Sequence, residues 1–194
     1  MKLKSVSAII PAAGNSGRMG TDKALLGFPG GINFANHLVN CYRRFAADPI
    51  VLVVNSQLDL SRLQAGPCLL VVNEHVERGR SWSIKIAIGK VPSGYSCFIQ
   101  NVDNPFSEIA LLEKLNSSLK DEAYMIPVCK GKGGHPVLLG SRIVDFIREM
   151  KDDTDFMDVL CQFERIEIPW PGEGILWNIN TPAEYEQFIR KAQF

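Results

Sequence analysis

Long apolar runs and an excess of charge of either sign are both missing from this 194-residue sequence. Its longest apolar stretches have the length of one strand, well short of the roughly 20 residues that a membrane-spanning helix needs. The 21 Lys and Arg residues balance the 21 Asp and Glu residues, so the basic surface of a nucleic-acid-binding protein is not expected. The sequence therefore predicts no membrane partner and no nucleic-acid partner.

Paired cysteines are also missing. The five cysteines are scattered, and no two of them form C-x-x-C, which argues against a disulfide framework: Cys41, Cys68, Cys97, Cys129 and Cys161. Four of them lie in apolar contexts, so we expect small buried side chains in a reducing compartment. The N-terminal segment is too short and polar for a signal peptide and has no cleavage site. These features predict a cytoplasmic protein.

Length and composition fit one domain. Single domains usually have about 100–200 residues, and a chain that is 46% hydrophobic can bury a core without disulfides. The sequence has no internal repeat and no linker. We therefore expect one domain over residues 1–194.

Short apolar runs rich in β-branched residues alternate with segments of helical periodicity. Strands buried on both faces are expected at Val6–Pro11, Ile50–Val54, Cys68–Val72 and Cys97–Val102. Helices are expected at Ile32–Ala46, Ser81–Ile88 and Ser107–Leu119, the last with Ser107 as its N-cap. This alternation predicts an α/β fold, a doubly wound three-layer α/β/α domain with a mostly parallel sheet.

The second half of the chain follows a less regular pattern. Strands at Ala123–Cys129 and Pro136–Leu139 flank a glycine-rich loop or hairpin. Two helices are expected next, at Ser141–Met150 and Thr154–Gln162. Short strands at Arg165–Trp170 and Ile175–Asn178 then predict a small C-terminal β-hairpin extension. A capping box made by Thr181 and Glu184 predicts the final helix, Thr181–Ala192.

The loop after the first strand carries the strongest indication of chemistry. Small residues at Ala12, Ala13 and Gly14 let a phosphate chain approach the backbone N–H groups, at the sheet edge where open α/β folds bind ligands. Arg18 and Lys23 add two cations. The loop is neither a Walker A loop nor G-x-G-x-x-G. On the residues alone, an ordinary glycine-rich turn with solvated cations is the alternative.

Ala12–Lys23 resembles the A-A-G-x-S-x-R-M-G-x-x-K signature of the MobA-like NTP transferases, the molybdopterin cytidylyl- and guanylyltransferases, and matches it at every position. The resemblance implies the nucleotide-diphospho-sugar transferase fold. It also implies transfer of a nucleoside monophosphate from an NTP to a phosphate-bearing small-molecule acceptor, with release of pyrophosphate. It further implies that these residues bind the nucleotide: Ala12, Ala13, Gly14, Ser16, Gly17, Arg18 and Lys23. Arg18 and Lys23 would be catalytic.

Two downstream segments resemble the metal-binding parts of that family. Val102-Asp103-Asn104-Pro105 is similar to G-D-x-P, whose aspartate ligates Mg²⁺, although Asn101 replaces the usual glycine. Asn178-Ile179-Asn180-Thr181-Pro182 is similar to D/N-I-D/N-T-P. The resemblance implies a catalytic Mg²⁺ site, with Mn²⁺ as a substitute, on Asp103 and Asn180. Helix capping by Asp103 and a turn role for Asn180 are the alternatives.

Two further segments resemble substrate-binding parts. Gly134-His135-Pro136-Val137 is similar to G-H-P-V on the acceptor side, so His135 either contacts an acceptor phosphate or is a hairpin histidine. Gly79–Ile84 is similar to G-x-x-x-S-[LI], which implies that Ser83 faces the base or sugar. A helix cap at Ser81 explains the serines equally well. Strand-end asparagines Asn55 and Asn73 are weaker candidates for base contacts.

The sequence leaves substrate and activity open. The sequence is compatible with CTP and with GTP as the nucleotide, because some of its motifs resemble the cytidylyltransferases and others the guanylyltransferases. The acceptor implied by resemblance is molybdopterin or molybdenum cofactor, with a client oxidoreductase as protein partner; a sugar-1-phosphate or an isoprenoid phosphate is the alternative. A noncatalytic nucleotide-binding or partner protein is the alternative of another class, since Asn101 departs from the family pattern and a second acidic metal ligand is missing.

Overall fold

The computed structural model describes residues 5–28, 30–63 and 66–192. The signal-peptide prediction rests in part on residues 1–4, which lie outside the described residues. Within the described ranges, no helix has the length and apolar character needed to cross a membrane.

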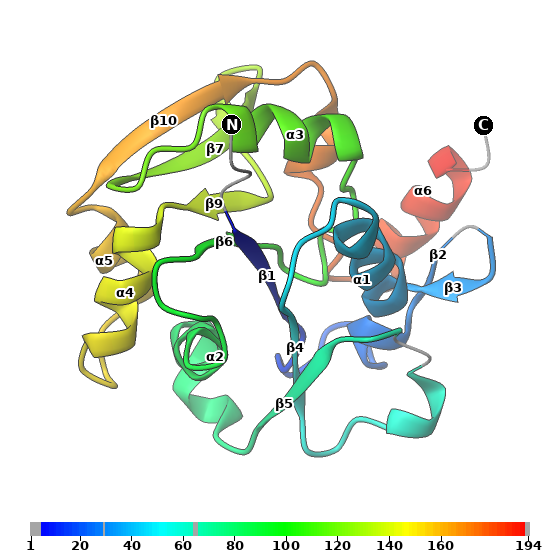
Figure 1. The fold of residues 1–194 in the computed structure, drawn as a ribbon. Coiled ribbons are helices and arrows are strands. Elements are labelled where there is room, and N and C mark those ends of the chain that lie inside the picture. Colours follow the sequence, from blue (N-terminus) through cyan, green and yellow to red (C-terminus); the bar gives the residue numbers. More distant parts are fainter. Residues whose placement is uncertain (1–4, 29, 64–65, 193–194) are drawn as a thin grey trace.

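An eight-stranded sheet forms the centre of the molecule (Figure 1). Seven strands follow the order β10-β7-β9-β6-β1-β4-β5, and β8 pairs with β7. Their bounds are β1 Val6–Pro11, β4 Ile50–Asn55, β5 Leu69–Asn73, β6 Ser96–Ile99, β7 Ala123–Cys129, β8 Lys132–Gly133, β9 Val137–Leu139 and β10 Glu164–Pro169. Pairing is parallel except at β8 and β9, which are antiparallel to their neighbours. A separate two-stranded ribbon joins β2 Gly27–Phe28 to β3 Ile32–Asn33.

Helices cover both faces of the sheet (Figure 1). One layer holds α1 Phe34–Arg44, α3 Ile109–Ser117 and α6 Pro182–Ala192; the other holds α2 Gly79–Ile88, α4 Ser141–Glu149 and α5 Phe156–Leu160. Alternate side chains of β1 feed the two cores. Ile10 packs in the core that contains Phe34, and Ile9 packs in the core that contains Ile84. The predicted three-layer, mostly parallel α/β fold is confirmed.

Two predicted strands differ from the structure. The run predicted at Cys68–Val72 is the edge strand β5. Leu69, Leu70 and Val72 are 45–47% exposed rather than buried, because β4 is the one strand that pairs with β5 among the described residues. The strand predicted at Ile175–Asn178 is wrong; the 3-10 helix η4, Glu173–Leu176, lies there. The hairpin of this part of the chain forms earlier, between β7 and β8.

The predicted cap at Ser107 is wrong, the alternative cap at Ser81 does not form, and the predicted cap of the final helix is confirmed. Glu108 precedes α3, while the Ser107 hydroxyl is buried without a hydrogen-bond partner. Ser81 lies inside α2, where its hydroxyl donates to Asp155 Oδ2 and accepts from the Phe156 N–H, both at 3.0 Å. At α6 the capping box forms as expected between Thr181 and Glu184.

The described cysteines are all free thiols. Cys41, Cys97 and Cys129 are buried, Cys68 is partly exposed and Cys161 is exposed. Burial raises the pKa of the Cys97 thiol to about 12, so this thiol stays protonated and packs as a small apolar side chain.

The topology gathers several loops at one edge of the sheet. The strands β1, β4, β5 and β6 run parallel, so their carboxyl ends meet there. Backbone bonds hold the ends together: the Ala12 N–H donates to Val53 O at 2.8 Å, and the Val102 N–H donates to Pro11 O at 3.2 Å. Because β9 is antiparallel to β6, its first residues and the preceding His135 arrive at the same edge.

Candidate functional site

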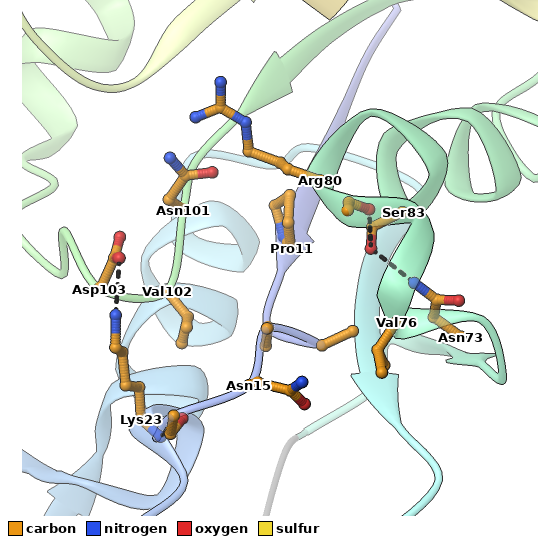
Figure 2. Close-up of a pocket in the computed structure, with 15 residues that line it drawn as sticks. Pro11, Asn15, Lys23, Asn73, Val76, Arg80, Ser83, Asn101, Val102 and Asp103 are labelled. Carbon is orange, nitrogen blue, oxygen red and sulfur yellow. Dashed lines mark hydrogen bonds and ion pairs between the residues drawn. The ribbon is translucent and has the colours of Figure 1, made fainter. Parts of the chain in front are cut away.

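A pocket of about 350 Å³ opens at this edge of the sheet (Figure 2). We call it the first pocket. Its walls come from the 11–16 loop, from Lys23, from Asn73 and Val76 after β5, from residues 79–83 at the start of α2, and from residues 101–103 after β6. The residues singled out from separate sequence motifs thus converge on one cavity.

The loop after β1 presents its backbone to the first pocket. Ala12 and Ala13 are buried, and a Cβ placed on Gly14 would meet no atom within 4 Å. The loop then folds back, since the N–H groups of Met19 and Gly20 both donate to Ser16 O at 2.9 Å. Gly20 has φ +73°, a conformation that side chains disfavour. An anion in this pocket could therefore approach the backbone at Gly14 closely.

Lys23 is held in place through its own backbone and its neighbour. Its N–H donates to Ser16 Oγ at 3.2 Å. Asp22 caps the short helix that begins at Lys23, because its Oδ1 accepts from the Ala24 N–H at 3.0 Å. Its Oδ2 accepts from Asn55 Nδ2 at 3.1 Å. Asn55, one of the weaker base-contact candidates, is thus engaged in supporting this loop.

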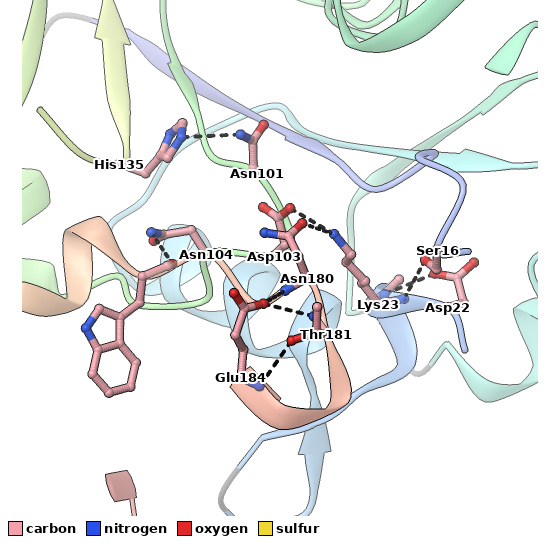
Figure 3. Close-up of polar contacts among 12 residues, drawn as sticks. Ser16, Asp22, Lys23, Asn101, Asp103, Asn104, His135, Asn180, Thr181 and Glu184 are labelled. Atoms are coloured by element: carbon pink, nitrogen blue, oxygen red, sulfur yellow. Dashed lines mark hydrogen bonds and ion pairs between the residues drawn. The ribbon is translucent and has the colours of Figure 1, made fainter. Parts of the chain in front are cut away.

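The Lys23 ammonium joins the two expected metal ligands (Figure 3). Its Nζ lies 3.1 Å from Asp103 Oδ2 and 2.6 Å from Asn180 Oδ1. The Lys23 and Asp103 side chains are only 16% and 23% exposed, so these contacts are partly shielded from water. The other carboxylate oxygen, Asp103 Oδ1, is buried and has no hydrogen-bond partner.

Asn104 anchors the loop that carries Asp103. It is fully buried, and its Nδ2 donates to Ile175 O at 3.0 Å and to Trp177 O at 2.6 Å. Its Oδ1 accepts from Gln100 Nε2 at 3.2 Å. The segment before α6 is tied to the same loop, because the Ile179 N–H donates to Asp103 O at 2.8 Å. These bonds fix Asp103 and Asn180 relative to each other.

The oxygen atoms at this point suit a hard divalent cation. Asp103 and Asn180 supply carboxylate and amide oxygens, which Mg²⁺ and Mn²⁺ prefer, and Asp103 Oδ1 is buried without a hydrogen-bond partner. Among the described residues, no group of three or more His, Cys, Asp or Glu side chains could hold a metal. Two protein residues leave most positions around such a cation to water or phosphate oxygens.

A neutral pair of side chains lies at the other end of the first pocket (Figure 2). Asn73 Nδ2 donates to Ser83 Oγ at 2.9 Å, and both residues are buried. Asn73 Oδ1 accepts from the His75 N–H at 2.8 Å, and His75 itself is exposed beside Glu77. The pair therefore offers a neutral hydroxyl and amide to whatever occupies this end.

A second pocket of about 170 Å³ shares Arg80 and Asn101 with the first. We call it the second pocket. Large apolar side chains line much of it, among them Tyr124, Ile126, Phe156 and Leu160. His135 and Arg165 add polar groups to its wall. The two pockets are thus neighbours with different linings.

His135 is enclosed at the boundary between the pockets. Its Nε2 lies 3.3 Å from Asn101 Nδ2 (Figure 3). Burial lowers the pKa of His135, so the ring is neutral at neutral pH; the Asn101 amide then donates to Nε2. The turn is tightly packed, because a Cβ on Gly134 would lie 2.4 Å from Ile175 O. His135 is therefore a neutral, fixed group.

Most of the predicted site residues lie together, but two do not. Ala12, Ala13, Gly14, Ser16, Lys23, Ser83 and Asp103 line the first pocket. Asn180 joins them through Lys23, and His135 lines the second pocket. Gly17 and Arg18 are exposed and outside the lining of both pockets. Backbone N–H donation from Asn180 lowers the pKa of Glu184, and the charge of Arg18 contributes to this lowering, which places Arg18 towards the start of α6.

Sequence reasoning missed three residues of the site. Arg80 borders both pockets, Asn101 contacts His135, and Asn104 anchors the Asp103 loop. Arg80 and Asn104 lie at positions that the quoted motifs leave variable, and Asn101 was noted only as a departure from the family pattern. The one feature of the sequence that could have identified them is that each lies within a few residues of a predicted site residue.

Known proteins resemble this chain over nearly its whole length. The family model described as a MobA-like NTP transferase domain matches residues 8–166. Molybdenum cofactor cytidylyltransferase of Escherichia coli (strain K12) is 24% identical over 94% of this chain and 95% of its own. A probable molybdenum cofactor guanylyltransferase of Carboxydothermus hydrogenoformans is 23% identical over 97% of both chains.

A solved structure shares the fold. The crystal structure of Rv0371c from Mycobacterium tuberculosis H37Rv superposes with a TM-score of 0.81 at 21% identity, over 98% of this chain and 100% of that one. A second crystal structure of that protein is a complex with manganese, with a TM-score of 0.77 at 17% identity, over 96% and 98% of the chains. With a family model that matches residues 8–166, this chain belongs to the MobA-like NTP transferase family and is an enzyme of the nucleotidyltransferase class.

Proposed function

We propose that this enzyme transfers a nucleoside monophosphate from CTP or GTP to a phosphate-bearing acceptor, a molybdopterin-type cofactor, and releases pyrophosphate in the cytoplasm. The observation that carries the proposal is the meeting of Lys23, Asp103 and Asn180 beside the loop that lines the first pocket. The curated relatives are molybdenum cofactor cytidylyl- and guanylyltransferases, and their names are the source of the proposed acceptor and bases.

The NTP occupies the first pocket in this proposal. The triphosphate lies along Ala12–Ser16. The N–H groups of residues 13–16 can donate to it, whereas the Ala12 N–H already donates to Val53 O, and Lys23 neutralises part of the triphosphate's charge. The base or sugar lies towards Ser83 and Asn73, whose neutral hydroxyl and amide suit hydrogen bonding to an uncharged group. Arg18, on the exposed part of the same loop, binds the outer phosphates at the entrance.

Asp103 and Asn180 hold Mg²⁺, with Mn²⁺ as a substitute. A bound divalent cation neutralises phosphate charge and polarises the α-phosphate. The manganese complex of the mycobacterial protein supports a divalent cation in this fold. The limited set of protein oxygens supports a cation that is shared with the substrate's phosphates.

The acceptor occupies the second pocket. Its apolar walls suit a ring system, and Arg80 and Arg165 can bind a phosphate by paired N–H donation. An acceptor phosphate oxygen attacks the α-phosphorus in line, a new P–O bond forms to the acceptor, and the bond to pyrophosphate breaks. The acceptor phosphate is already ionised, so the residues of the chain act by positioning and charge stabilisation.

Pyrophosphate release in a matrix of four NTPs and three acceptors tests the proposal. The acceptors are molybdopterin, a sugar-1-phosphate and an isoprenoid-pathway phosphate, each with and without Mg²⁺. We expect Mg²⁺-dependent release with molybdopterin and with CTP or GTP, and its loss in Asp103→Asn. Release with another acceptor would replace the proposed substrate. Binding of Mg-NTP without release in any combination would point to the noncatalytic alternative.

A further inference from the structure

A positive charge of the protein occupies the place where the metal is expected. Lys23 Nζ is within 3.1 Å of Asp103 Oδ2 and 2.6 Å of Asn180 Oδ1. An ammonium group can only donate, so both oxygens direct lone pairs at Lys23. The three residues are far apart in sequence, and hydrogen bonds with Ser16, Asn104 and Glu184 fix their loops. The contact is thus part of the folded site.

The ammonium and a divalent cation compete for these oxygens. A cation bound by both would lie about 2 Å from each, only a few Å from Nζ. Like charges at that separation repel strongly in a partly shielded site, and Lys23 and Asp103 are 16% and 23% exposed. Only Asp103 Oδ1, which is buried and unpartnered, is left unused by the ammonium.

The Lys23 ammonium could also bind a polyphosphate in the first pocket. The backbone of Lys23 is fixed by Ser16 Oγ, but the side chain also lines the first pocket beside the 12–16 loop. A polyphosphate in that pocket would present anionic oxygens to the same ammonium. Movement of the ammonium to the phosphates would free the oxygens of Asp103 and Asn180.

We propose that Lys23 is an internal occupant of the metal position, which keeps the nucleotide-free protein weak in divalent-cation binding and makes tight binding depend on the nucleotide. The inference rests on the proposed function in one respect, that Asp103 and Asn180 form the divalent-cation site. In this inference, Lys23 neutralises phosphate charge and also makes tight binding of the divalent cation follow binding of the nucleotide.

Mn²⁺ binding measured by electron paramagnetic resonance on the folded, nucleotide-free chain tests this inference directly. Lys23→Met removes the charge at similar length, and we expect it to bind Mn²⁺ at least about tenfold more tightly than wild type. Lys120→Met is the matched control, because it removes the same charge from an exposed residue that precedes β7 at the opposite edge of the sheet. Thermal unfolding verifies that each variant is folded.

A second pair of measurements locates the cation and tests the exchange. Lys23→Met combined with Asp103→Asn should lose the tenfold gain. With α,β-methylene-CTP or α,β-methylene-GTP present, and the nucleotide's own Mn²⁺ binding subtracted from a protein-free blank, the difference between Lys23→Met and wild type should shrink to threefold or less.

Three outcomes would overturn the inference. Equal Mn²⁺ affinity of wild type and Lys23→Met without nucleotide would do so, and would leave the proposed function intact if wild type still releases pyrophosphate. A gain that survives Asp103→Asn would place the cation elsewhere and would remove these ligands from the proposed function as well. A tenfold difference that persists with nucleotide would show that Lys23 stays on the metal ligands.

Discussion

The two neighbouring pockets differ in what surrounds a ligand. The first is walled mainly by loop backbone, small residues and short polar side chains, with Lys23 and Asp103 at one end. The second is walled mainly by large apolar side chains, with Arg165 and His135 among them. Arg80 and Asn101 belong to both. In the proposed function, this contrast distinguishes the nucleotide site, with its small and polar walls, from a site whose large side chains select the acceptor.

The largest expected effect falls on the charged end of the first pocket. Lys23→Met or Asp103→Asn should lower kcat by about 10²-fold or more, because each removes a preorganised charge at the reacting phosphates. Steady-state pyrophosphate release measures this, with Lys120→Met as the control. Near-full turnover in either variant would remove that residue from the mechanism.

The next effect tests whether the Asp103 side of the first pocket depends on the hydrogen bonds of Asn104. Asn104→Ala removes the side-chain donor to the carbonyls of Ile175 and Trp177, although Ile175 O keeps the His135 N–H. The substitution should lower the free energy of unfolding by about 1–3 kcal/mol. Urea denaturation measures it, and Asn178→Ala, at an exposed position of the following motif, is the control. A loss below about 0.5 kcal/mol would mean that the loop is held by other contacts.

Substitution of two arginines, Arg165 and Arg80, tests whether the two pockets bind different substrates. Arg165→Ala should raise the KM for the acceptor about tenfold and leave the KM for the NTP unchanged, since Arg165 lines only the second pocket and one charge-assisted contact is worth about 1.4 kcal/mol. Arg80→Ala should raise both KM values. Kinetics with each substrate varied in turn measure this. If both variants changed the two KM values in the same way, the two pockets would not bind different substrates.

The smallest effect concerns Arg18. It is exposed and outside both pocket linings, so Arg18→Ala should raise the KM for the NTP about threefold and leave kcat nearly unchanged, as expected for a solvent-screened charge. A fall in kcat comparable to that of Lys23→Met would show that the 16–20 loop closes onto the phosphates during turnover.

Sequence reasoning predicted the elements of the site better than their contacts. Lys23 and Asp103 could be placed at one edge because they follow parallel strands, whose carboxyl ends lie together. Asn180 was predicted to join them only through the family resemblance. Their direct contact could not be predicted, since it depends on how Ser16 and Asn104 fix the loops. Arg80 resembles any solvated arginine in a helix's first turn, and no spacing reveals that it borders two cavities.

The wrong strand at Ile175–Asn178 and the wrong burial of the strand at Cys68–Val72 both have tertiary causes. Ile175–Asn178 is apolar enough for a strand, but the carbonyls of Ile175 and Trp177 accept from Asn104, and the segment coils into η4 instead of pairing. The composition of β5 equals that of a central strand, yet its outer edge has no partner strand within the described sheet. The position of β5 in the sheet determines how far its side chains are buried, and the composition of the strand does not reveal that position.

A thermal-shift panel with CTP, GTP, ATP and UTP, with and without Mg²⁺, on wild type and Asp103→Asn tests the central claim most directly. A ligand at 100 times its Kd adds about 2.7 kcal/mol of stability, which corresponds to a rise in Tm of several degrees for a chain of this size. The account predicts that CTP or GTP raises the Tm in a Mg²⁺-dependent manner and that Asp103→Asn abolishes the Mg²⁺ dependence. No shift with any nucleotide, or an undiminished Mg²⁺-dependent shift in Asp103→Asn, would contradict it.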